Sequence, residues 1–524
     1  MTAFALVGST GKSFERGIGT YGLMASISGL IHAAIFFLVG IRLWAFGKKH
    51  GYITQIQFFR ARFESDALGY LLFPILVLLV IPYLLIGIIG AGKTIEPVTA
   101  GAFPNLFTHP SAPPWLGGIP PWLTGLVVSM VVLAYVFMGG SRGAAYANTF
   151  QTMVFMVMGL VAFVFIIDRL GGVERAGEVA ARITQNGMVV QDYRFDKATQ
   201  KTLLNQPPKA IGKLIASESS EFVDQRPHLW RVPTIVEFKK KDPVTGSLVS
   251  FNRELGIPFF TFVTYLFIPL SVGMFPHLFQ HWLTARSAKS FRLTVVAHPL
   301  CIMIVWVPCV LIGLWATGKL PESTPGGAVL AKMVGILIAD PVVSGLVTAG
   351  ILAAIMSSLD SQFLCLGTMF TNDIVIDTYG KEKFSDKQIV TIARVFVVSI
   401  VVLTYILSIV LYKKSVFDLA VWRFSGFASL TPLVFAALYW KGCSKLGAMA
   451  SIIAAVGVWL YFFAKSGWGG EYTVEAEWIV NSIGEGVMPV ALSFGSGLVA
   501  MIFVSLVTPK PSKETIDKFF PNFG

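Results

Sequence analysis

Charged side chains are scarce in this sequence. Asp, Glu, Lys and Arg make up 13% of its 524 residues, whereas hydrophobic residues make up 54% and the mean hydropathy is +0.70. A soluble domain of this length does not need so much apolar surface, so the composition excludes a soluble protein. Apolar runs of about 20 residues recur instead, long enough to cross a hydrocarbon core about 30 Å thick. The sequence therefore predicts an all-α polytopic membrane protein.

Cysteine is also rare, and the chain has no metal-binding spacing. The four cysteines, Cys301, Cys309, Cys365 and Cys443, lie in apolar runs or in one short loop, so no disulfide framework is predicted. The net charge of +12 comes from basic residues scattered through loops, as is usual at a cytoplasmic membrane surface. We therefore expect the lipid bilayer as a partner and no nucleic acid.

Eleven apolar segments are predicted to cross the membrane completely. They cover residues 18–46, 66–93, 122–139, 149–169, 257–280, 293–317, 343–371, 389–412, 416–440, 445–465 and 487–508. The loops between them alternate in charge, with Arg and Lys concentrated in every second loop. The positive-inside rule assigns these basic loops to the cytoplasm and makes the chain a multi-pass protein of the cell (inner) membrane.

A long hydrophilic insert divides the chain. We assign residues 1–168 to N-terminal membrane helices, 169–256 to an extracytoplasmic insert, 257–508 to C-terminal membrane helices and 509–524 to a short cytoplasmic tail. Within the insert, Thr234–Lys239 and Ser247–Asn252 are strand-like and flank a turn signal. The insert is interpreted as a cap or spacer, with a role as a lid or partner-binding surface as the alternative.

The first residues are apolar but too few to span a membrane. Loop parity makes Met1–Gly8 the outer half of a helix that starts in mid-bilayer, so we expect either an upstream start or a truncated form. The following Gly8-Ser-Thr-Gly11-Lys12-Ser13 resembles a phosphate loop, but its spacing is wrong and no nucleotide domain surrounds it. We expect its glycines to form a tight outer turn.

The most informative segment is Leu352–Ile374, an apolar run that carries polar side chains at membrane depth. Ala354, Ser357 and Ser358 are spaced i, i+3 and i+4, so they share one helix face. A carbonyl and two hydroxyls suit a small hard cation such as sodium. The alternative is close helix packing by small residues. The nearby Asp360 favours an ion site, because a carboxylate at this depth must be protonated, paired or bound to a cation.

One cation is predicted to lie as deep as Asp360. Arg423 follows Trp422 in the span 416–440, with Asp418 nearer the outer end. An arginine stays charged and binds carboxylates in a bidentate way, so it is a candidate anion-binding group in a substrate cavity. Two alternatives remain open: an internal ion pair with Asp360 or Asp418, and snorkelling toward the outer headgroups.

Proline interrupts the span 257–280 near its end. Pro276 kinks or unwinds the helix and frees carbonyl groups, which is tolerated where a helix lines a cavity. His277 and His281 follow it, at the predicted cytoplasmic mouth. They are candidates for a gate or a proton relay, although helix capping is the simpler interpretation.

These segments together resemble the sodium:solute symporter family. The matching blocks are AAIMSSLDSQ…FTNDI at 353–374, YVFMGGSRGAAYANTFQ at 135–151, PHLFQHWLTARS at 276–287 and FDLAVWRFSG…PLVFAALYWKG at 417–442. The resemblance implies a LeuT-type core of two inverted repeats, with substrate and sodium meeting at broken helices. It implies that sodium binds Ala354, Ser357 and Ser358, together with carbonyls of the first core helix, of which Met1 supplies one. The rest of that half-helix would lie upstream of this sequence.

Several positions depart from the family pattern. Ala147 and Asn148 replace the threonine and aspartate of a T-D-x-x-Q motif, His281 replaces a common arginine, and Arg423 replaces a small residue. The aspartate that is lost helps to form a second sodium site in some members. We hypothesise that Asp360 restores the lost charge, which makes Asp360, Ser361 and Asn148 a possible second ion site.

The sequence therefore predicts a sodium-coupled symporter, not an enzyme, that imports a small organic solute by alternating access. Arg423 favours a carboxylate, and the Pro-His block is closer to proline- and pantothenate-type members than to glucose-type ones. The substrate-binding candidates are Arg423, Trp422, Ser271 and Phe275. No organic cofactor is expected, and the sequence does not predict the oligomeric state. The alternatives are a proton-coupled symporter, with Asp360 titrating, and a non-transporting sensor or defective paralogue.

Overall fold

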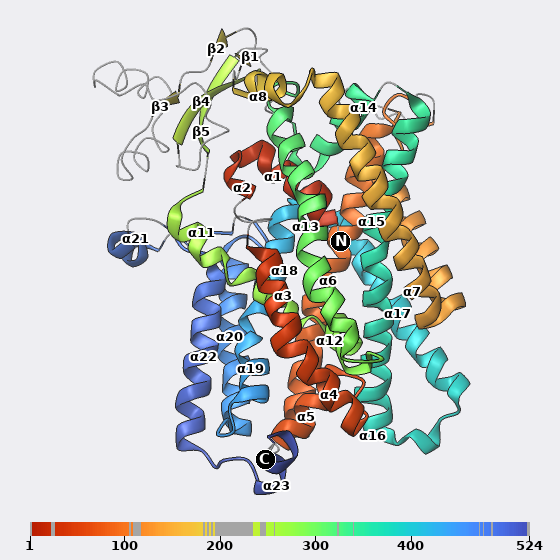
Figure 1. Cartoon of the computed structure of the whole chain (residues 1–524), viewed down its shortest axis with the longest axis vertical. Coiled ribbons are helices and arrows are strands. Elements are labelled where there is room, and N and C mark those ends of the chain that lie inside the picture. The colour runs from red at the N-terminus through yellow and green to blue at the C-terminus, as the bar shows by residue number, and fades with distance from the viewer. Residues whose placement is uncertain are drawn as a thin grey trace.

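A bundle of long helices dominates the computed structural model, and a small β-structure lies at one end of it (Figure 1). The structure describes residues 3–21, 27–103, 106–107, 117–181, 184–185, 188–189, 192–193, 234–241, 248–255, 257–321, 324–338, 340–470, 472–474, 476–483 and 486–520. In these residues, 10 helices are long and apolar enough to cross a membrane, or up to 11 with one bent pair. The prediction of an all-α polytopic bundle is confirmed.

The N-terminal part forms four of these spans. Its elements are η1 (Phe4–Gly8), α1 (Ser9–Arg16), α2 (Gly19–Tyr21), α3 (Ser28–Ile35), η3 (Phe36–Gly40), α4 (Ile41–His50), α5 (Gln55–Phe63), α6 (Asp66–Val98), α7 (Pro121–Leu170) and α8 (Val173–Ala181). The α3–η3–α4 run is one span, as is α6, and α7 contains two. The two spans of α7 meet at Gly140, whose φ of 55° and ψ of −152° break the helix as only glycine does readily.

The C-terminal part supplies the other spans. Its elements are α11 (Phe259–Tyr265), η5 (Ile268–Met274), α12 (Pro276–Thr284), α13 (Lys289–Ala316), η6 (Gly326–Ala328), α14 (Val329–Leu337), α15 (Pro341–Phe370), η7 (Thr371–Ile376), α16 (Asp377–Tyr379), η8 (Lys381–Lys383), α17 (Asp386–Val410), α18 (Val416–Ser429), α19 (Thr431–Tyr439), α20 (Lys445–Lys465), α21 (Glu477–Ile483), α22 (Pro489–Val507) and α23 (Lys513–Phe519). The run from α11 to α12 is bent by 49°, at the proline that the sequence marks as a break.

Side-chain caps set where the site-bearing helices begin. Asp340 accepts hydrogen bonds from the backbone N–H groups of Val342 and Val343, and Pro341 occupies the first turn of α15. Ser415 caps α18 in the same way by accepting from the N–H of Asp418 at 3.2 Å. The caps therefore fix the register in which α15 and α18 present their buried polar residues.

The β-structure belongs to the hydrophilic insert. Strands β4 (Thr234–Lys241) and β5 (Leu248–Leu255) pair antiparallel, and β3 (Asp192–Tyr193) pairs with β4. A second pair joins β1 (Thr184–Gln185) to β2 (Met188–Val189). The two predicted strands are present, and the turn predicted between them lies outside the described residues.

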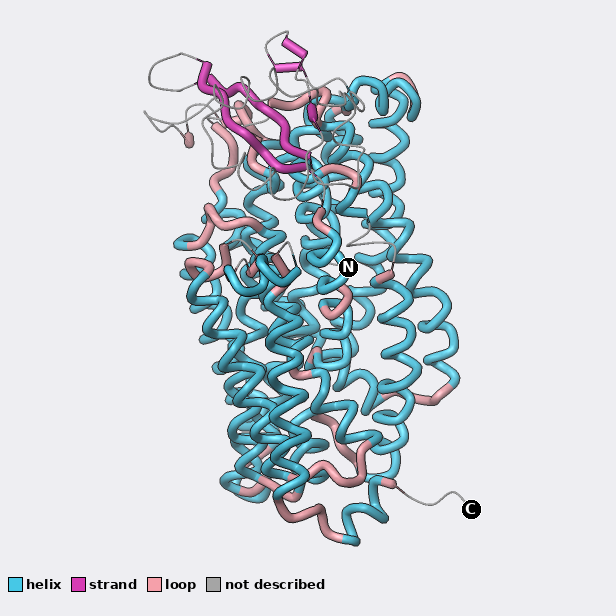
Figure 2. Tube along the Cα trace, turned by 90° about the vertical axis from the view of Figure 1, so that its left-hand side faces the viewer, coloured by secondary structure: helices cyan, strands magenta, loops and turns pink. Residues whose placement is uncertain are grey.

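The two ends of the bundle differ in what they carry. The strands and α8 lie at one end, and α4, α5, α16 and α23 lie at the other (Figure 1). Figure 2 likewise shows the strands gathered at one end of the helices. We call the strand-bearing end the outer end, following the charge pattern of the loops. The opposite end, the inner end, carries the predicted cytoplasmic loops.

One prediction about the N-terminal segment is wrong. The glycines of Gly8–Ser13 do not form a tight turn, because η1 and α1 continue as helix to Arg16. Gly11 is needed for packing instead, since a Cβ atom there would lie 2.4 Å from the carbonyl oxygen of Gly326. The turn comes later, at Gly17, whose φ is 81°.

Candidate functional site

Helix α15 carries the predicted sodium ligands in its buried middle part. Ala354 is completely buried, and the Ser357 hydroxyl donates to the Ala354 carbonyl at 3.0 Å. The Ser358 hydroxyl donates to the Ile355 carbonyl at 2.8 Å. Such bonds to the preceding turn leave hydroxyl lone pairs free to accept a cation. Met1, predicted to complete this site, lies outside the described residues.

The residues of the possible second ion site do lie together. Asp360 is completely buried, and its carboxylate accepts from the Asn148 amide at 3.0 Å, from the Ser361 hydroxyl at 3.2 Å and from the Tyr135 hydroxyl at 3.2 Å. The Asn148 amide also contacts the Ser361 hydroxyl at 3.0 Å. Asn148 and Tyr135 come from the two halves of α7, so the kink at Gly140 allows both to reach one carboxylate. Two hydroxyl groups and one amide nitrogen thus converge from two helices on one buried carboxylate.

The broken helix contributes a second set of candidates. Phe275 has extended backbone angles between η5 and α12, and Pro276 begins α12. Ser271 is buried in η5, while His281 is exposed on α12. His277 does not cap a helix end: its ring nitrogen lies 2.5 Å from the Gln362 amide nitrogen, and its ring stacks on Phe275. It therefore lies at the break itself and not at the inner mouth.

Arg423 lies beside this break, enclosed by aromatic rings. Its guanidinium carbon lies 3.5 Å from the ring centre of Tyr83, 4.5 Å from Phe275, 4.9 Å from Phe424 and 5.3 Å from Phe427. The side chain is 0% exposed, none of its three nitrogens makes a well-aligned hydrogen bond within the described residues, and the Tyr83 hydroxyl is a polar group beside it. Ring faces attract a cation but do not satisfy its N–H groups.

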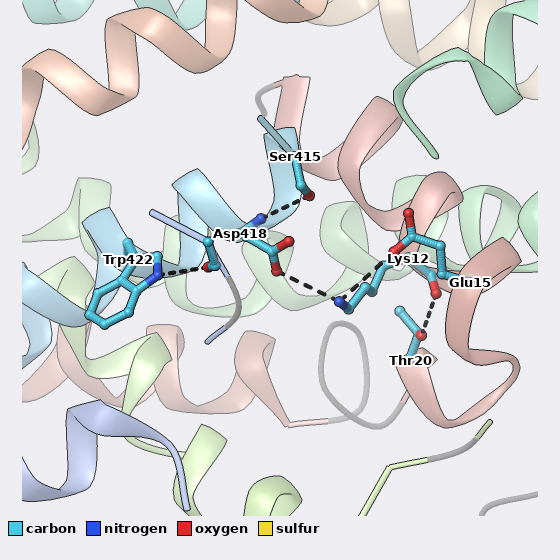
Figure 3. Close-up of polar contacts among 7 residues, drawn as sticks. Lys12, Glu15, Thr20, Ser415, Asp418 and Trp422 are labelled. Carbon is cyan, nitrogen blue, oxygen red and sulfur yellow. Dashed lines mark hydrogen bonds and ion pairs between the residues drawn. The ribbon is translucent and has the colours of Figure 1, made fainter. Parts of the chain in front are cut away.

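Both alternatives for Arg423 are therefore wrong. Asp418 forms its ion pair with Lys12 (Figure 3), Asp360 is bonded within its own cluster, and complete burial excludes snorkelling. Trp422 is directed elsewhere, since its indole donates to the Gly470 carbonyl at 3.0 Å and its ring packs on Trp459 and Tyr472. Of the four substrate-binding candidates, Arg423 and Phe275 are in contact and Trp422 is apart from them.

Two functional candidates were missed by sequence reasoning, Tyr135 and Tyr83. Tyr83 of α6 lies under the Arg423 guanidinium, and its hydroxyl lies near both Ser358 and Arg423. Tyr83 therefore touches both the predicted sodium face and the buried cation. The only sequence signal for Tyr135 was its place in the block 135–151, and Tyr83 had none, since a tyrosine in an apolar run is ordinary.

Comparisons with known proteins show which family this chain resembles. The family model of the sodium:solute symporter family matches residues 118–455. The osmoregulated proline transporter OpuE of Bacillus subtilis is 25% identical over 299 residues, and this match spans 54% of each chain, about half the length of OpuE. Sodium/proline symporter 2 of Staphylococcus saprophyticus is 24% identical over 537 residues, covering 98% of this chain and 84% of that protein.

A solved structure shows the same fold. The substrate-bound, outward-open state of a Na+-coupled sialic acid symporter matches with a TM-score of 0.63 and 14% identity, covering 98% of this chain and 88% of the other. This confirms the LeuT-type bundle and a multi-pass membrane protein. The family consists of transporters, not enzymes. Since its family model covers more than half of the sequence, this chain belongs to the sodium:solute symporter family.

Proposed function

We propose that this protein is a sodium-coupled symporter that imports a small organic solute bearing a carboxylate. The observation that carries the carboxylate is Arg423, buried completely with three nitrogens unpartnered among the described residues. A buried guanidinium without hydrogen bonds is costly, and a bidentate carboxylate satisfies it. The relatives named as proline transporters fit this class, because proline carries a carboxylate.

Sodium would bind the α15 face formed by the Ala354 carbonyl and the hydroxyls of Ser357 and Ser358. Hard oxygen ligands suit Na+, and Ser358 lies against Tyr83, which in turn lies against Arg423. A cation at Ser358 and an anion at Arg423 would therefore share one neighbour. Binding of either ion then favours binding of the other, as coupling between two sites requires.

The cluster around Asp360 is the candidate for a second coupling ion. Its carboxylate accepts from three side chains and can also bind a cation, with the Ser361 hydroxyl as a further ligand. An inward-negative membrane potential would drive each imported cation with about 2.3 kcal/mol per 100 mV. Two cations imported with one carboxylate would make transport electrogenic.

The experiment is uptake into proteoliposomes with labelled proline, a short monocarboxylate and glucose, comparing sodium with choline at fixed pH. We expect sodium-dependent uptake of a carboxylate and no uptake of glucose. Ser358→Ala should raise the sodium concentration for half-maximal uptake, whereas Ser399→Ala, on the exposed face of α17, is the matched control. Uptake of the carboxylate that ignores sodium would refute sodium coupling, and uptake of glucose alone would refute the role of Arg423.

Proton coupling is the second candidate, and Asp360 is the residue that favours it. A buried carboxylate can carry a proton in place of a cation. Uptake that follows a pH gradient without sodium, and that Asp360→Asn abolishes, would support this candidate over sodium coupling.

A further inference from the structure

Two hollows follow one another along the seam between α7 and α13. Helix α8 packs against both of these helices at the outer end, and the outer hollow lies there (Figure 1). The deeper hollow lies between the same two helices, with residues of η1, α14 and α15 on its inner wall. Because α7 and α13 both end at the outer end of the bundle, residue number orders the two hollows by depth.

The outer hollow carries three basic side chains. They are Arg169 at the end of α7, Arg175 on α8 and Lys319 just after α13, and Asp168 is the one carboxylate among the lining residues. None of the three basic side chains forms an ion pair with a carboxylate in the described part of the chain. The hollow has a volume of about 240 Å³, and its lining has a formal charge of +2. It therefore suits an anionic group such as a phosphate.

The local backbone positions Arg175 in this hollow. Helix α7 ends at Leu170, and Gly171 has a left-handed conformation with a φ of 81°, which turns the chain toward α8. The Arg175 side chain lies across this turn, since a Cβ atom on Gly171 would lie 2.8 Å from Arg175 Cδ. On the α13 side the hollow is lined by Trp315, whose ring stacks on Phe163 of α7 with 5.9 Å between the ring centres. The turn and the ring stack therefore define two walls of the hollow.

The deeper hollow is apolar and opens toward the bilayer. Its lining includes Gly159, Leu160 and Ala162 of α7 and Ile304, Pro308 and Ile312 of α13. Leu160 is 55% exposed and Ile304 is 49% exposed, so the mouth of the hollow faces the hydrocarbon of the membrane. The enclosed volume is only about 40 Å³. The hollow is therefore a narrow groove, and an acyl chain would lie along it without being enclosed.

The order of the two hollows matches the shape of a phospholipid. Asp168 lies six residues beyond Ala162 on α7, which is about 9 Å along the helix axis, and Trp315 lies three residues beyond Ile312 on α13. One leaflet of the hydrocarbon core is about 15 Å thick. A headgroup phosphate in the outer hollow would therefore have an acyl chain beside the apolar groove.

We propose that the seam between α7 and α13 binds an anionic phospholipid of the outer leaflet. Its phosphate lies at Arg175 and Lys319, and one acyl chain lies along the groove at Gly159. A guanidinium binds phosphate oxygens in a bidentate way, and the ammonium adds a second positive charge. Neither hollow is lined by a residue of the candidate sodium, Asp360 or Arg423 sites, so the lipid does not compete with the solute.

The experiment titrates the purified full chain in detergent with phosphatidylglycerol, phosphatidylcholine or inorganic phosphate and measures binding by native mass spectrometry. We expect phosphatidylglycerol to bind about tenfold more tightly than phosphatidylcholine, because only its headgroup has a net negative charge. Replacing both Arg175→Gln and Lys319→Gln should remove this preference. The matched control replaces Lys413→Gln and Lys465→Gln, two exposed lysines elsewhere at the outer end, and should keep it.

A second variant tests the position of the acyl chain. A Cβ atom on Gly159 would have no neighbour within 4 Å, so Gly159→Phe should fill the groove without a backbone clash. It should weaken the binding of both lipids about fivefold, because the chain loses its apolar contact. Gly457→Phe, at an equally open glycine of α20, is the control that should leave both affinities unchanged.

Three results would overturn the proposal. Equal affinities for the two lipids would mean that the outer hollow does not select an anionic headgroup. An equal loss of preference in the Lys413→Gln and Lys465→Gln control would show only a general attraction of charge. Displacement of phosphatidylglycerol by inorganic phosphate, together with unchanged lipid binding in Gly159→Phe, would show a site for free anions. None of these measurements needs a transported solute, so their result is separate from the uptake experiment.

Discussion

Asp360 and Arg423 are both completely buried, but the groups that surround the two charged side chains differ. Asp360 accepts hydrogen bonds from Tyr135, Asn148 and Ser361, so its charge is stabilised before any ligand arrives. Arg423 lies among four aromatic rings, and none of its nitrogens is bonded within the described part of the chain.

These surroundings indicate which function each charged side chain suits. A carboxylate held by neutral donors keeps its geometry when a cation comes and goes, which suits a coupling ion. A guanidinium without partners gains most from a bidentate anion, which suits a transported solute. Substitutions at the two positions should therefore both reduce uptake but change stability in opposite directions.

The largest effect is expected at Asp360. Asp360→Ala removes the acceptor that Tyr135, Asn148 and Ser361 share, and a buried polar group left without a partner costs about 1–3 kcal/mol. We expect lower thermal stability in detergent and uptake reduced at least 100-fold. Tryptophan fluorescence during heating and uptake in proteoliposomes measure the two effects.

Asp360→Asn removes the negative charge but keeps the shape of the side chain. It keeps the side-chain volume and one acceptor, so most of the stability should return while sodium-dependent uptake stays low. If Asp360→Asn left both transport and its sodium dependence intact, the role of Asp360 as an ion ligand would be wrong.

Arg423→Met should raise the stability of the protein, whereas Asp360→Ala should lower it. Methionine removes a buried charge that has no hydrogen-bonded partner, so unfolding should become harder by roughly 1 kcal/mol, after the loss of the ring contacts. Uptake of a carboxylate should fall about 100-fold, because a charge-assisted bidentate bond is lost.

Arg423→Lys is the matched control for this second comparison. Lysine keeps the charge but not the planar fork, so we expect weak uptake with a raised KM. Lower stability in Arg423→Met would contradict the comparison, since it would mean that the ring contacts outweigh the cost of burying the guanidinium.

The apolar runs were sufficient to predict a bundle of membrane-spanning helices, because span length follows directly from bilayer thickness, whereas the LeuT-type arrangement was expected only from the family resemblance. All eleven predicted segments correspond to helical spans, with α11–α12 as the bent pair. The serines of α15 and the Asp360 cluster could be predicted because polar residues at membrane depth are rare.

The partners of these residues could not be predicted, because they depend on how helices pack. The sequence placed Asp418 close to Arg423, but the cation that reaches Asp418 is Lys12, from a helix that sequence reasoning treated as a turn. Tyr83 is one apolar-run tyrosine among several, and only the packing of α6 against α18 brings it to Arg423. Burial of a charge was predictable, whereas its neighbours were not.

Tyr135 offers a smaller and sharper test of how Asp360 is stabilised. Tyr135→Phe removes one of three donors without changing the packing of the ring, and a single hydrogen bond to a charged group contributes about 1.5–3 kcal/mol. We expect the sodium concentration for half-maximal uptake to change about tenfold, with maximal uptake retained. Tyr146→Phe, at an exposed tyrosine of α7, is the control that should leave the sodium titration unchanged.

The smallest effect is expected at Glu64, a solvent-exposed carboxylate at the inner end. It accepts hydrogen bonds from the hydroxyls of Ser512 and Thr515, which begin α23, and these bonds lower the pKa of Glu64. Phe519 of the same helix is buried against Phe46 and Phe58. Like Asp360, Glu64 is therefore a carboxylate that accepts hydrogen bonds from hydroxyl groups, but it lies at the surface.

The sign of its pH dependence follows from the lowered pKa. The bonded carboxylate stabilises the docked helix above the unfolded pKa of about 4.3, and this contribution is lost as the pH falls through the lower folded value. A spin label at Asp517→Cys, on the exposed side of α23, should show an ordered line shape from pH 7 to 5 and a more mobile one below pH about 4.

Two variants decide whether Glu64 is responsible. Glu64→Gln should make the label more mobile at pH 7 and remove the change below pH about 4. Glu514→Gln, at an exposed carboxylate of α23, should keep both the ordered line shape and its pH dependence. The burial of Phe519 continues to hold the helix in every variant, so the change in mobility should be modest. An unchanged line shape from pH 7 to 3 in the wild-type sequence would show that apolar contacts alone dock α23.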